Sequence, residues 1–128
     1  MQYSSNVGSE WQSIYFSQQL VTDYKDLCQM KHGATDEVPP LLCARVWQNF
    51  KLFQIFKDRS IALVSTDLTQ HHKLNCDMTY QAKLTCKNIK QLKKYTKYTF
   101  VLEIFEHHSL CLAITQQFIE WRSENANF

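Results

Sequence analysis

The residues from 74 to 86 alternate strictly between apolar and polar side chains. The apolar set falls on the even positions: Leu74, Cys76, Met78, Tyr80, Ala82, Leu84 and Cys86. Because successive side chains of a strand point to opposite faces, this alternation predicts a strand with one buried and one solvated face. Such one-sided burial is typical of antiparallel sheets. A run of this length corresponds either to one strongly bent strand or to two strands with a turn between them.

Short apolar runs before and after this segment predict further strands of the same sheet. Their lengths suit strands, and polar turn sequences separate several of them. The residues "KDRS" are suited to a hairpin turn, and His107 and His108 join the last two runs. The expected strands cover residues 41–47, 51–56, 61–65, 99–106 and 109–114.

A helix is predicted before these strands, over residues 9–32. Apolar residues recur there at the three- and four-residue spacing of one helical face: Phe16, Leu20, Tyr24, Leu27 and Cys28. Ser9 and Gln12 have the spacing of a capping box, and Gly33 is suited to the C-terminal cap. The proline pair at 39–40 cannot continue a helix, so the chain must leave the helix before it.

A second helix is predicted at the end of the chain, over residues 115–127. Thr115 can cap it, and Phe118 and Trp121 share one face, so we expect the indole of Trp121 to pack against the sheet. A chain of 128 residues is one domain by length and buries about two-thirds of its unfolded surface. The expected fold class is therefore α+β, a single domain over 1–128 with an antiparallel sheet or barrel of about six or seven strands closed by a C-terminal helix.

This order of elements resembles the pleckstrin-homology (PH) superfold over residues 41–128. The segment "KLFQIFKDRSIALVS" is similar to the second and third strands of that family, and Trp121 follows "YTFVLEIF" and "HSLCLAI" at the matching place. The resemblance implies a seven-stranded antiparallel sheet closed by a terminal helix whose tryptophan packs on the core. A polo-box domain, which is a six-stranded sheet with a terminal helix, is a neighbouring architecture that fits the same pattern.

The bases that PH domains use for phosphoinositides are only partly present. Members that bind these lipids carry a lysine in the first strand and an arginine or lysine in the second, around a long basic loop. In this chain the loop shortens to about "QNF", and Arg45 and Lys51 are the matching bases. Members without the lipid signature generally bind proteins, so the resemblance implies a PH-like protein-interaction module.

Metal-binding and catalytic patterns are weak in this sequence. The zinc-ligand residue types form two histidine pairs and two cysteines: His71, His72, His107, His108, Cys76 and Cys86. The cysteines alternate with apolar residues, and adjacent strand side chains diverge, so a four-ligand site is not expected. The chain lacks GxSxG, HExxH and glycine-rich phosphate loops. Cys111 lies close to a histidine pair, but its neighbours predict a buried strand. We expect no catalysis, no metal and no cofactor.

Positive charge gathers in one part of the chain, although the net charge is only +2. Residues 73–99 carry seven lysines against the single acid Asp77. Lysines with aromatic residues between them can bind an acidic peptide, anionic lipid or a nucleic-acid strand. We expect an acidic, partly apolar protein segment as the partner, with lipid or nucleic acid as alternatives. A solvated basic loop is the simplest interpretation. The candidate binding residues are Lys87, Lys90, Lys93, Lys94, Tyr95, Lys97 and Tyr98.

Trp11 and Tyr15 are a second set of candidate binding residues, because Trp and Tyr are enriched at interfaces. Packing of their helix on its own core is the default expectation. The N-terminal residues lack the basic and apolar regions of a signal peptide, and no apolar run reaches the ~20 residues of a membrane span. An odd count of five cysteines fits free thiols in a reducing compartment. The sequence thus predicts a non-catalytic interaction module of an intracellular scaffold or complex, in the cytoplasm or nucleus.

Overall fold

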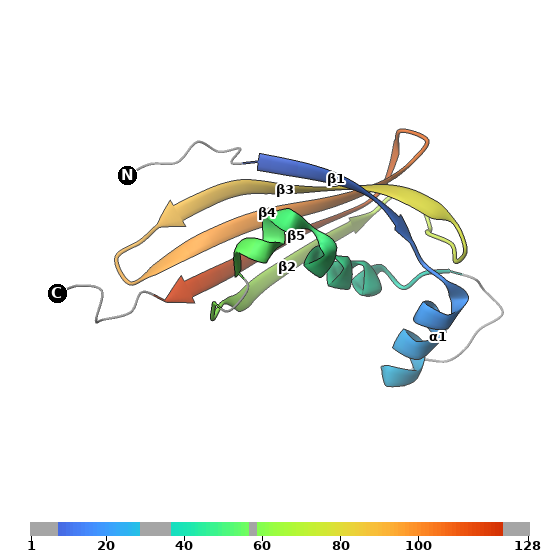
Figure 1. The fold of residues 1–128 in the computed structure, drawn as a ribbon, viewed down its shortest axis with the longest axis horizontal. Coiled ribbons are helices and arrows are strands. Elements are labelled where there is room, and N and C mark those ends of the chain that lie inside the picture. Colours follow the sequence, from blue (N-terminus) through green and yellow to red (C-terminus); the bar gives the residue numbers. More distant parts are fainter. Residues whose placement is uncertain (1–7, 29–36, 57–58, 122–128) are drawn as a thin grey trace.

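One five-stranded antiparallel sheet forms the centre of the molecule (Figure 1). The computed structural model describes residues 8–28, 37–56 and 59–121. The strands lie in the order β1-β3-β4-β5-β2. The expectation of about six or seven strands was wrong, because the described residues form five. Their bounds are Gly8–Tyr15 for β1, Ala62–Gln70 for β2, Thr79–Gln91 for β3, Tyr95–Glu106 for β4 and Ser109–Trp121 for β5.

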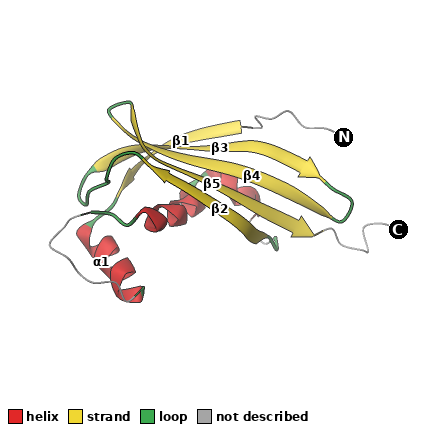
Figure 2. Ribbon diagram, turned by 180° about the vertical axis from the view of Figure 1, so that it is seen from behind, coloured by secondary structure: helices red, strands yellow, loops and turns green. Residues whose placement is uncertain are grey.

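Two consecutive 3₁₀ helices lie across the concave face of the sheet, and the strands curve around them (Figures 1 and 2). They are η1 (Pro40–Asn49) and η2 (Lys51–Phe56). The one α-helix among the described residues, α1 (Gln18–Leu27), lies beyond one end of the sheet. Within the described ranges, no helix is both long enough and apolar enough to cross a membrane.

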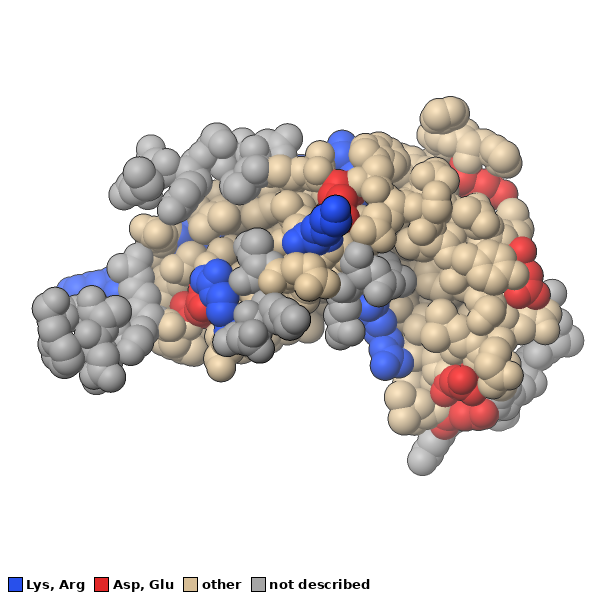
Figure 3. All heavy atoms as spheres, in the orientation of Figure 1, with Lys and Arg blue, Asp and Glu red and all other residues tan. Residues whose placement is uncertain are grey.

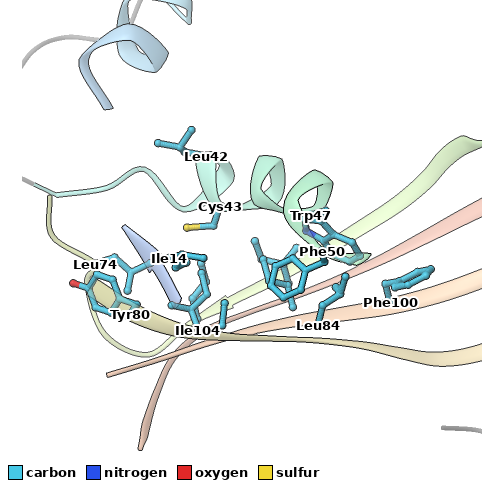
Figure 4. Close-up of a cluster of buried hydrophobic side chains, with 14 of the residues drawn as sticks. Ile14, Leu42, Cys43, Trp47, Phe50, Leu74, Tyr80, Leu84, Phe100 and Ile104 are labelled. Carbon is cyan, nitrogen blue, oxygen red and sulfur yellow. The ribbon is translucent and has the colours of Figure 1, made fainter. Parts of the chain in front are cut away.

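An aromatic row on η1 and η2 explains why this segment is helical. Trp47, Phe50, Phe53 and Phe56 follow one another at three-residue spacing. A 3₁₀ helix has three residues per turn, which places Phe53 and Phe56 on one face of η2. Phe50 lies between the two helices with an extended backbone (φ −94°, ψ 136°), and its side chain is buried like that of Trp47. Figure 4 shows Trp47 and Phe50 pointing from this segment toward the sheet. The Trp47 ring lies 5.7 Å from the Phe100 ring of β4, measured between centroids. The row therefore fixes the helical segment on the sheet.

The strands predicted over 41–47 and 51–56 are wrong, because both segments belong to these helices. Short apolar runs fit a strand and a helix equally well when only their periodicity is considered. Two features of the sequence favour the helix. Pro40 is the first residue of η1, where its missing N–H has no helical partner to lose, and the aromatic spacing continues unbroken to Phe56.

The alternation from residue 74 to residue 86 has the burial that the sequence predicted, except that Thr85, expected on the solvated face, is buried. Its even-numbered side chains are buried, apart from the half-buried Met78. The chain is neither one bent strand nor two strands here, because β3 begins only at Thr79. Before it, Asp77 adopts a left-handed conformation (φ 60°), and its backbone N–H donates to the carbonyl of Phe16 at 2.7 Å. This turn joins the start of β3 to the end of β1.

The helix predicted over 9–32 is only partly correct, because its first half is strand β1. This strand pairs with β3 from Gly8 opposite Cys86 to Tyr15 opposite Thr79. The helix begins later, where the hydroxyl of Ser17 accepts from the N–H of Leu20 at 3.1 Å. The capping box at Ser9 and Gln12 was therefore wrong. The predicted cap at Gly33 lies outside the described residues.

The helix predicted over 115–127 is wrong as far as Trp121, since β5 continues to that residue. Its even positions face the helices, and there the amide of the buried Gln116 donates to Thr66 Oγ1 at 3.0 Å. Because the polar Gln116 stands at an inward-facing position, the two-residue alternation of β5 was not apparent in the sequence. The indole of Trp121 is 61% exposed, not packed on the core. The PH-like architecture and its polo-box alternative are contradicted, because β5 runs through to Trp121 and no helix closes the sheet among the described residues. Residues 122–127 lie outside the described ranges.

Candidate functional site

A pocket of about 530 Å³ opens at one end of the sheet, on the face turned away from η1 and η2. Its walls come from β1, from the start of β3 and from the turn between β4 and β5. Pockets of this size accommodate small molecules. The lining residues are Trp11, Met78, Thr79, Gln81, Phe105, Glu106, His107 and His108.

The apolar wall of this pocket is built by aromatic residues of β1 and β4. The rings of Trp11 and Phe105 lie 5.5 Å apart between centroids, and Trp11 is 54% exposed. Lys83 is the partner of Trp11 in the β1–β3 ladder, and its ammonium group lies 5.6 Å from the indole centroid. A cation over an indole is held by the ring quadrupole. The wall thus presents an apolar surface with positive charge beside it.

The polar rim of the pocket is the turn between β4 and β5. Its two central residues, His107 (φ 48°) and His108 (φ 70°), both adopt the left-handed conformation. A two-residue hairpin turn with positive φ at both positions usually contains Asn and Gly, because other side chains cost about 1–2 kcal/mol each there. Two exposed imidazoles are therefore displayed beside the apolar wall in spite of a conformational cost. Backbone strain of this kind gathers at functional sites.

Two further side chains complete the wall between the aromatic pair and the rim. The amide of Gln81 donates to the hydroxyl of Ser13 at 3.0 Å across β1 and β3, which fixes its orientation. Glu106 is half-buried beside the turn. The pocket thus combines an apolar wall with a rim that can donate and accept hydrogen bonds. That combination suits an amphiphilic ligand.

Neither a metal centre nor a reactive thiol is built from the described residues around this pocket. Within the described ranges, no three His, Cys, Asp or Glu side chains gather closely enough to hold a metal ion. Cys111 is buried, as its strand neighbours predicted, and burial raises the pKa of its thiol. Burial also raises the pKa of Cys86, and that of Cys43 to about 12. These thiols stay protonated and inert at neutral pH.

The lysines predicted as a binding site lie at the opposite end of the sheet. They belong to the hairpin formed by β3 and β4, which extend into the segment that the sequence suggested was a basic connection. Lys87, Lys90, Lys93 and Lys94 are exposed, while Lys97 is half-buried. The predicted contact role of these residues stays a prediction.

The four aromatic residues predicted as contacts differ in burial and in position on the sheet. Tyr95 is half-buried beside Trp121, but Tyr98 is buried, and its hydroxyl donates to Glu120 at 3.0 Å. Trp11 lines the pocket. Tyr15 is also exposed, and its hydroxyl donates to Asp77 at 3.1 Å.

Sequence reasoning missed most of the pocket. His107 and His108 were considered as a strand connection, as metal ligands and as possible bases beside Cys111, but not as part of a pocket, and Phe105 was considered only as a strand residue. The solvated face of the alternating run carried a usable signal, since Thr79 and Gln81 lie on it. What the sequence could not show is that β1 pairs with β3, which brings Trp11 to the same wall.

Sequence comparisons connect the chain with a family found in staphylococci. A family model described as "Uncharacterised conserved protein VraC" matches residues 1–122. "Protein VraC" of Staphylococcus epidermidis is 37% identical over 122 residues, which cover 95% of this chain and 100% of that protein. "Protein VraC" of Staphylococcus haemolyticus is 36% identical over 120 residues, covering 93% and 94%.

Structural comparisons identify a hot-dog fold, which corrects the PH-like expectation. The HadBC (3R-hydroxyacyl-ACP dehydratase) complex of Mycobacterium tuberculosis matches with a TM-score of 0.76 at 7% identity, covering 93% of this chain and 99% of that chain. The (R)-hydratase of A. caviae matches with a TM-score of 0.65 at 10% identity, covering 87% and 92%. An acyl-CoA hydrolase of Staphylococcus aureus matches with a TM-score of 0.57 at 8% identity, covering 91% and 65%. At these identities the likeness shows the fold alone.

Proposed function

Since the chain belongs to the VraC family of conserved proteins, we propose that it binds an acyl thioester or a related acyl amphiphile in the pocket beside Trp11. The observation that carries this proposal is the pairing of an apolar wall with a polar, imidazole-bearing rim. An acyl chain would lie against Trp11 and Phe105. The carbonyl and the polar carrier would lie at His107 and His108.

The structural neighbours support the same class of ligand. Two of them are a hydroxyacyl-ACP dehydratase and an acyl-CoA hydrolase, so related folds handle acyl groups carried on large polar carriers. A shared fold does not transmit a function by itself, since one fold hosts many activities. The acyl part of the proposed ligand is therefore inferred from the pocket. Only the large polar carrier is suggested by the structural neighbours.

We propose binding without turnover, in line with the non-catalytic role expected from the sequence. A nucleophile is normally activated by a hydrogen bond to a base that a third group orients. Among the described residues of the pocket, no hydrogen bond joins the imidazole of His107 or His108 to a nucleophilic side chain. Both imidazoles are exposed to water. A scaffold for binding fits these features better than a catalytic centre.

The test is calorimetric titration of the protein with butyryl-CoA, with CoA alone and with free butyrate, followed by the same titrations of Trp11→Ala. We expect butyryl-CoA to bind more tightly than either fragment, and Trp11→Ala to weaken it about tenfold or more, about 1.4 kcal/mol. Trp121→Ala is the matched control, because it removes an exposed indole at the other end of the sheet. Equal affinities of the wild type and Trp11→Ala for butyryl-CoA would show that this ligand does not bind in the pocket.

The same samples show whether the chain is an enzyme. Release of free CoA thiol from butyryl-CoA, measured with a thiol reagent and absent from a protein-free control, would contradict binding without turnover. A variant in which both His107 and His108 are replaced by Asn should then lose that release, since Asn tolerates the left-handed turn. We expect no release above the control.

A second candidate is the interaction module that the sequence predicted, without its PH-like fold. Strand β2 favours it, because this edge strand is exposed on both faces and carries Leu63 and Val64 at 52% and 50% exposure. An open apolar edge is a template for pairing with another strand, including that of a second copy. Val64→Lys should lower the sedimentation mass if two copies pair there. If the wild type and Val64→Lys sediment with the same mass, pairing of two copies through β2 is contradicted.

A further inference from the structure

The hairpin end of the sheet carries a cluster of positive charge that the described part of the chain leaves unneutralised. Residues 87–97 include five lysines and no acid. Within the described ranges, no ion pair involves these lysines. The nearby carboxylate of Glu120 is held by the guanidinium of Arg59, which donates through Nε at 2.8 Å, and by the hydroxyl of Tyr98. The field at this end of the molecule is therefore positive.

Two of these lysines are held in an unfavourable arrangement. Lys90 and Lys97 lie directly opposite each other in the β3–β4 ladder. Like charges directly opposite each other destabilise an antiparallel pair. An anionic surface against this face would neutralise both ammonium groups and remove the repulsion.

The exposed Trp121 and the half-buried Tyr95 lie beside the lysines, on the same face of the sheet. Tyr95 is opposite Trp121 in the β4–β5 ladder, and the next pair on that face is Lys97 and Ile119. The two rings contact edge to face, with centroids 5.3 Å apart. Trp121 is 61% exposed. We call this surface the hairpin-end patch, and it consists of Lys90, Lys93, Lys94, Lys97, Tyr95 and Trp121.

Exposed aliphatic side chains continue the apolar part of this end. Strand β2 begins beside the patch, with Ala62 opposite Ile119, and the exposed Leu63 and Val64 follow. Most acidic side chains on the face in Figure 3 lie toward the α1 end, away from the hairpin. The molecule thus has one end that is both basic and apolar. A negative surface would orient the chain with this end first.

We propose that the hairpin-end patch binds the surface of an anionic bilayer, with the lysines on lipid headgroups and Trp121 and Tyr95 at the membrane interface. Basic side chains near an anionic leaflet attract it, and Trp and Tyr favour the headgroup level. This surface is separate from the pocket, at the opposite end of β4. The proposal therefore stands or falls independently of the acyl ligand.

One feature favours a bilayer over the other polyanions. Recognition of a particular phosphate or carboxylate favours the planar fork of arginine, whereas lysine is a mobile point charge that suits a diffuse anionic surface. The hairpin carries lysines only. The acidic protein segment expected from the sequence is the alternative occupant, and the same experiment tests it.

The experiment is co-sedimentation of the full chain with vesicles of phosphatidylglycerol and phosphatidylcholine, compared with vesicles of phosphatidylcholine alone. We expect binding to the anionic vesicles in low salt, weaker binding in high salt and little binding to the neutral vesicles. Each lysine at an anionic surface contributes roughly a fivefold factor. Lys93→Gln with Lys94→Gln should therefore reduce the partition coefficient about 25-fold.

Two further variants test whether vesicle binding depends on the hairpin-end patch or only on the total positive charge of the chain. Lys51→Gln with Lys73→Gln removes the same charge from exposed positions outside the patch and should change binding about twofold or less. Trp121→Ala should weaken vesicle binding at high salt, where the apolar contact remains. No binding to anionic vesicles in low salt, or an equal loss in both lysine pairs, would overturn the proposal. Binding of poly-glutamate or oligothymidylate without vesicle binding would assign the patch to an acidic protein or to nucleic acid instead.

Discussion

Replacing Trp47 by alanine should be the most destabilising change among the three tryptophans. Trp47 is 2% exposed, and its ring contacts Phe53, Phe100 and Phe118 at centroid distances of 5.8, 5.7 and 5.9 Å. A buried tryptophan removes about 200 Å² from water, which at about 25 cal/mol per Å² is worth about 5 kcal/mol. Its indole N–H is buried and has no hydrogen-bond partner in the described structure, which offsets about 1–3 kcal/mol of that gain. We therefore expect Trp47→Ala to cost about 2–4 kcal/mol.

The matched variants separate size, polarity and position. Trp47→Phe keeps most of the ring volume and removes the unpaired N–H, so we expect it to cost about 1 kcal/mol. Trp121→Ala removes an exposed indole whose only described ring contact is Tyr95, so we expect a cost of about 1 kcal/mol or less. These values are read as free energies of unfolding from urea titrations. For a chain of this length, 3 kcal/mol lowers the melting temperature by roughly 10 °C.

The ranking of the two alanine variants is decisive. A large loss for Trp121→Ala with little loss for Trp47→Ala would refute the placement of η1 against the sheet. It would restore the terminal helix that the sequence suggested.

Three other predictions follow from individual contacts. Of the five cysteines, Cys28 alone is exposed, so a thiol reagent at mild alkaline pH should modify one thiol rapidly in the folded chain and the other four only after unfolding. Arg59 lowers the pKa of Glu120 by hydrogen bonding, so the stabilisation from this pair is present above the unfolded pKa of the carboxyl and is lost as pH falls through the folded pKa. Glu120→Gln should therefore cost about 0.5–1 kcal/mol at pH 7, with the difference from wild type shrinking in acid, as urea titrations at several pH values would reveal. Ser17→Ala removes the N-cap of α1 and should cost about 1 kcal/mol of unfolding free energy in the same titration, unless the helix contributes nothing to global stability.

The sequence predicted those parts of the fold that depend on local side-chain periodicity. The alternation around Tyr80 correctly indicated a half-buried segment, and the two last apolar runs joined at His107 and His108 are β4 and β5. Prediction failed where one pattern fits two structures. The runs before Phe56 satisfy both periods, so their apolar pattern alone does not distinguish a strand from a helix, although Pro40 and the three-residue aromatic spacing favour the helix.

The candidate site was harder to predict because it is made by long-range pairing. Trp11 was chosen as a candidate contact on a predicted helix, whereas the strand β1 places it on the pocket wall with Phe105, and its role in binding stays a prediction. Trp121 was assigned to the core because a polar residue at position 116 disguised the end of β5. Its exposure beside Tyr95 is a consequence of the register of β4 with β5, which local sequence does not specify.

The most direct test of the proposed function is a titration of the isotopically labelled chain with butyryl-CoA, followed through the three indole N–H resonances. The three tryptophans lie in three different places: Trp11 in the pocket, Trp47 in the core and Trp121 at the hairpin-end patch. Single Trp→Phe variants assign the signals. The account predicts a saturable shift of the Trp11 resonance, with the Trp47 and Trp121 resonances unmoved. A Trp11 resonance that stays in place at saturating ligand, or a shift confined to Trp47 or Trp121, would contradict the pocket as the acyl-binding site.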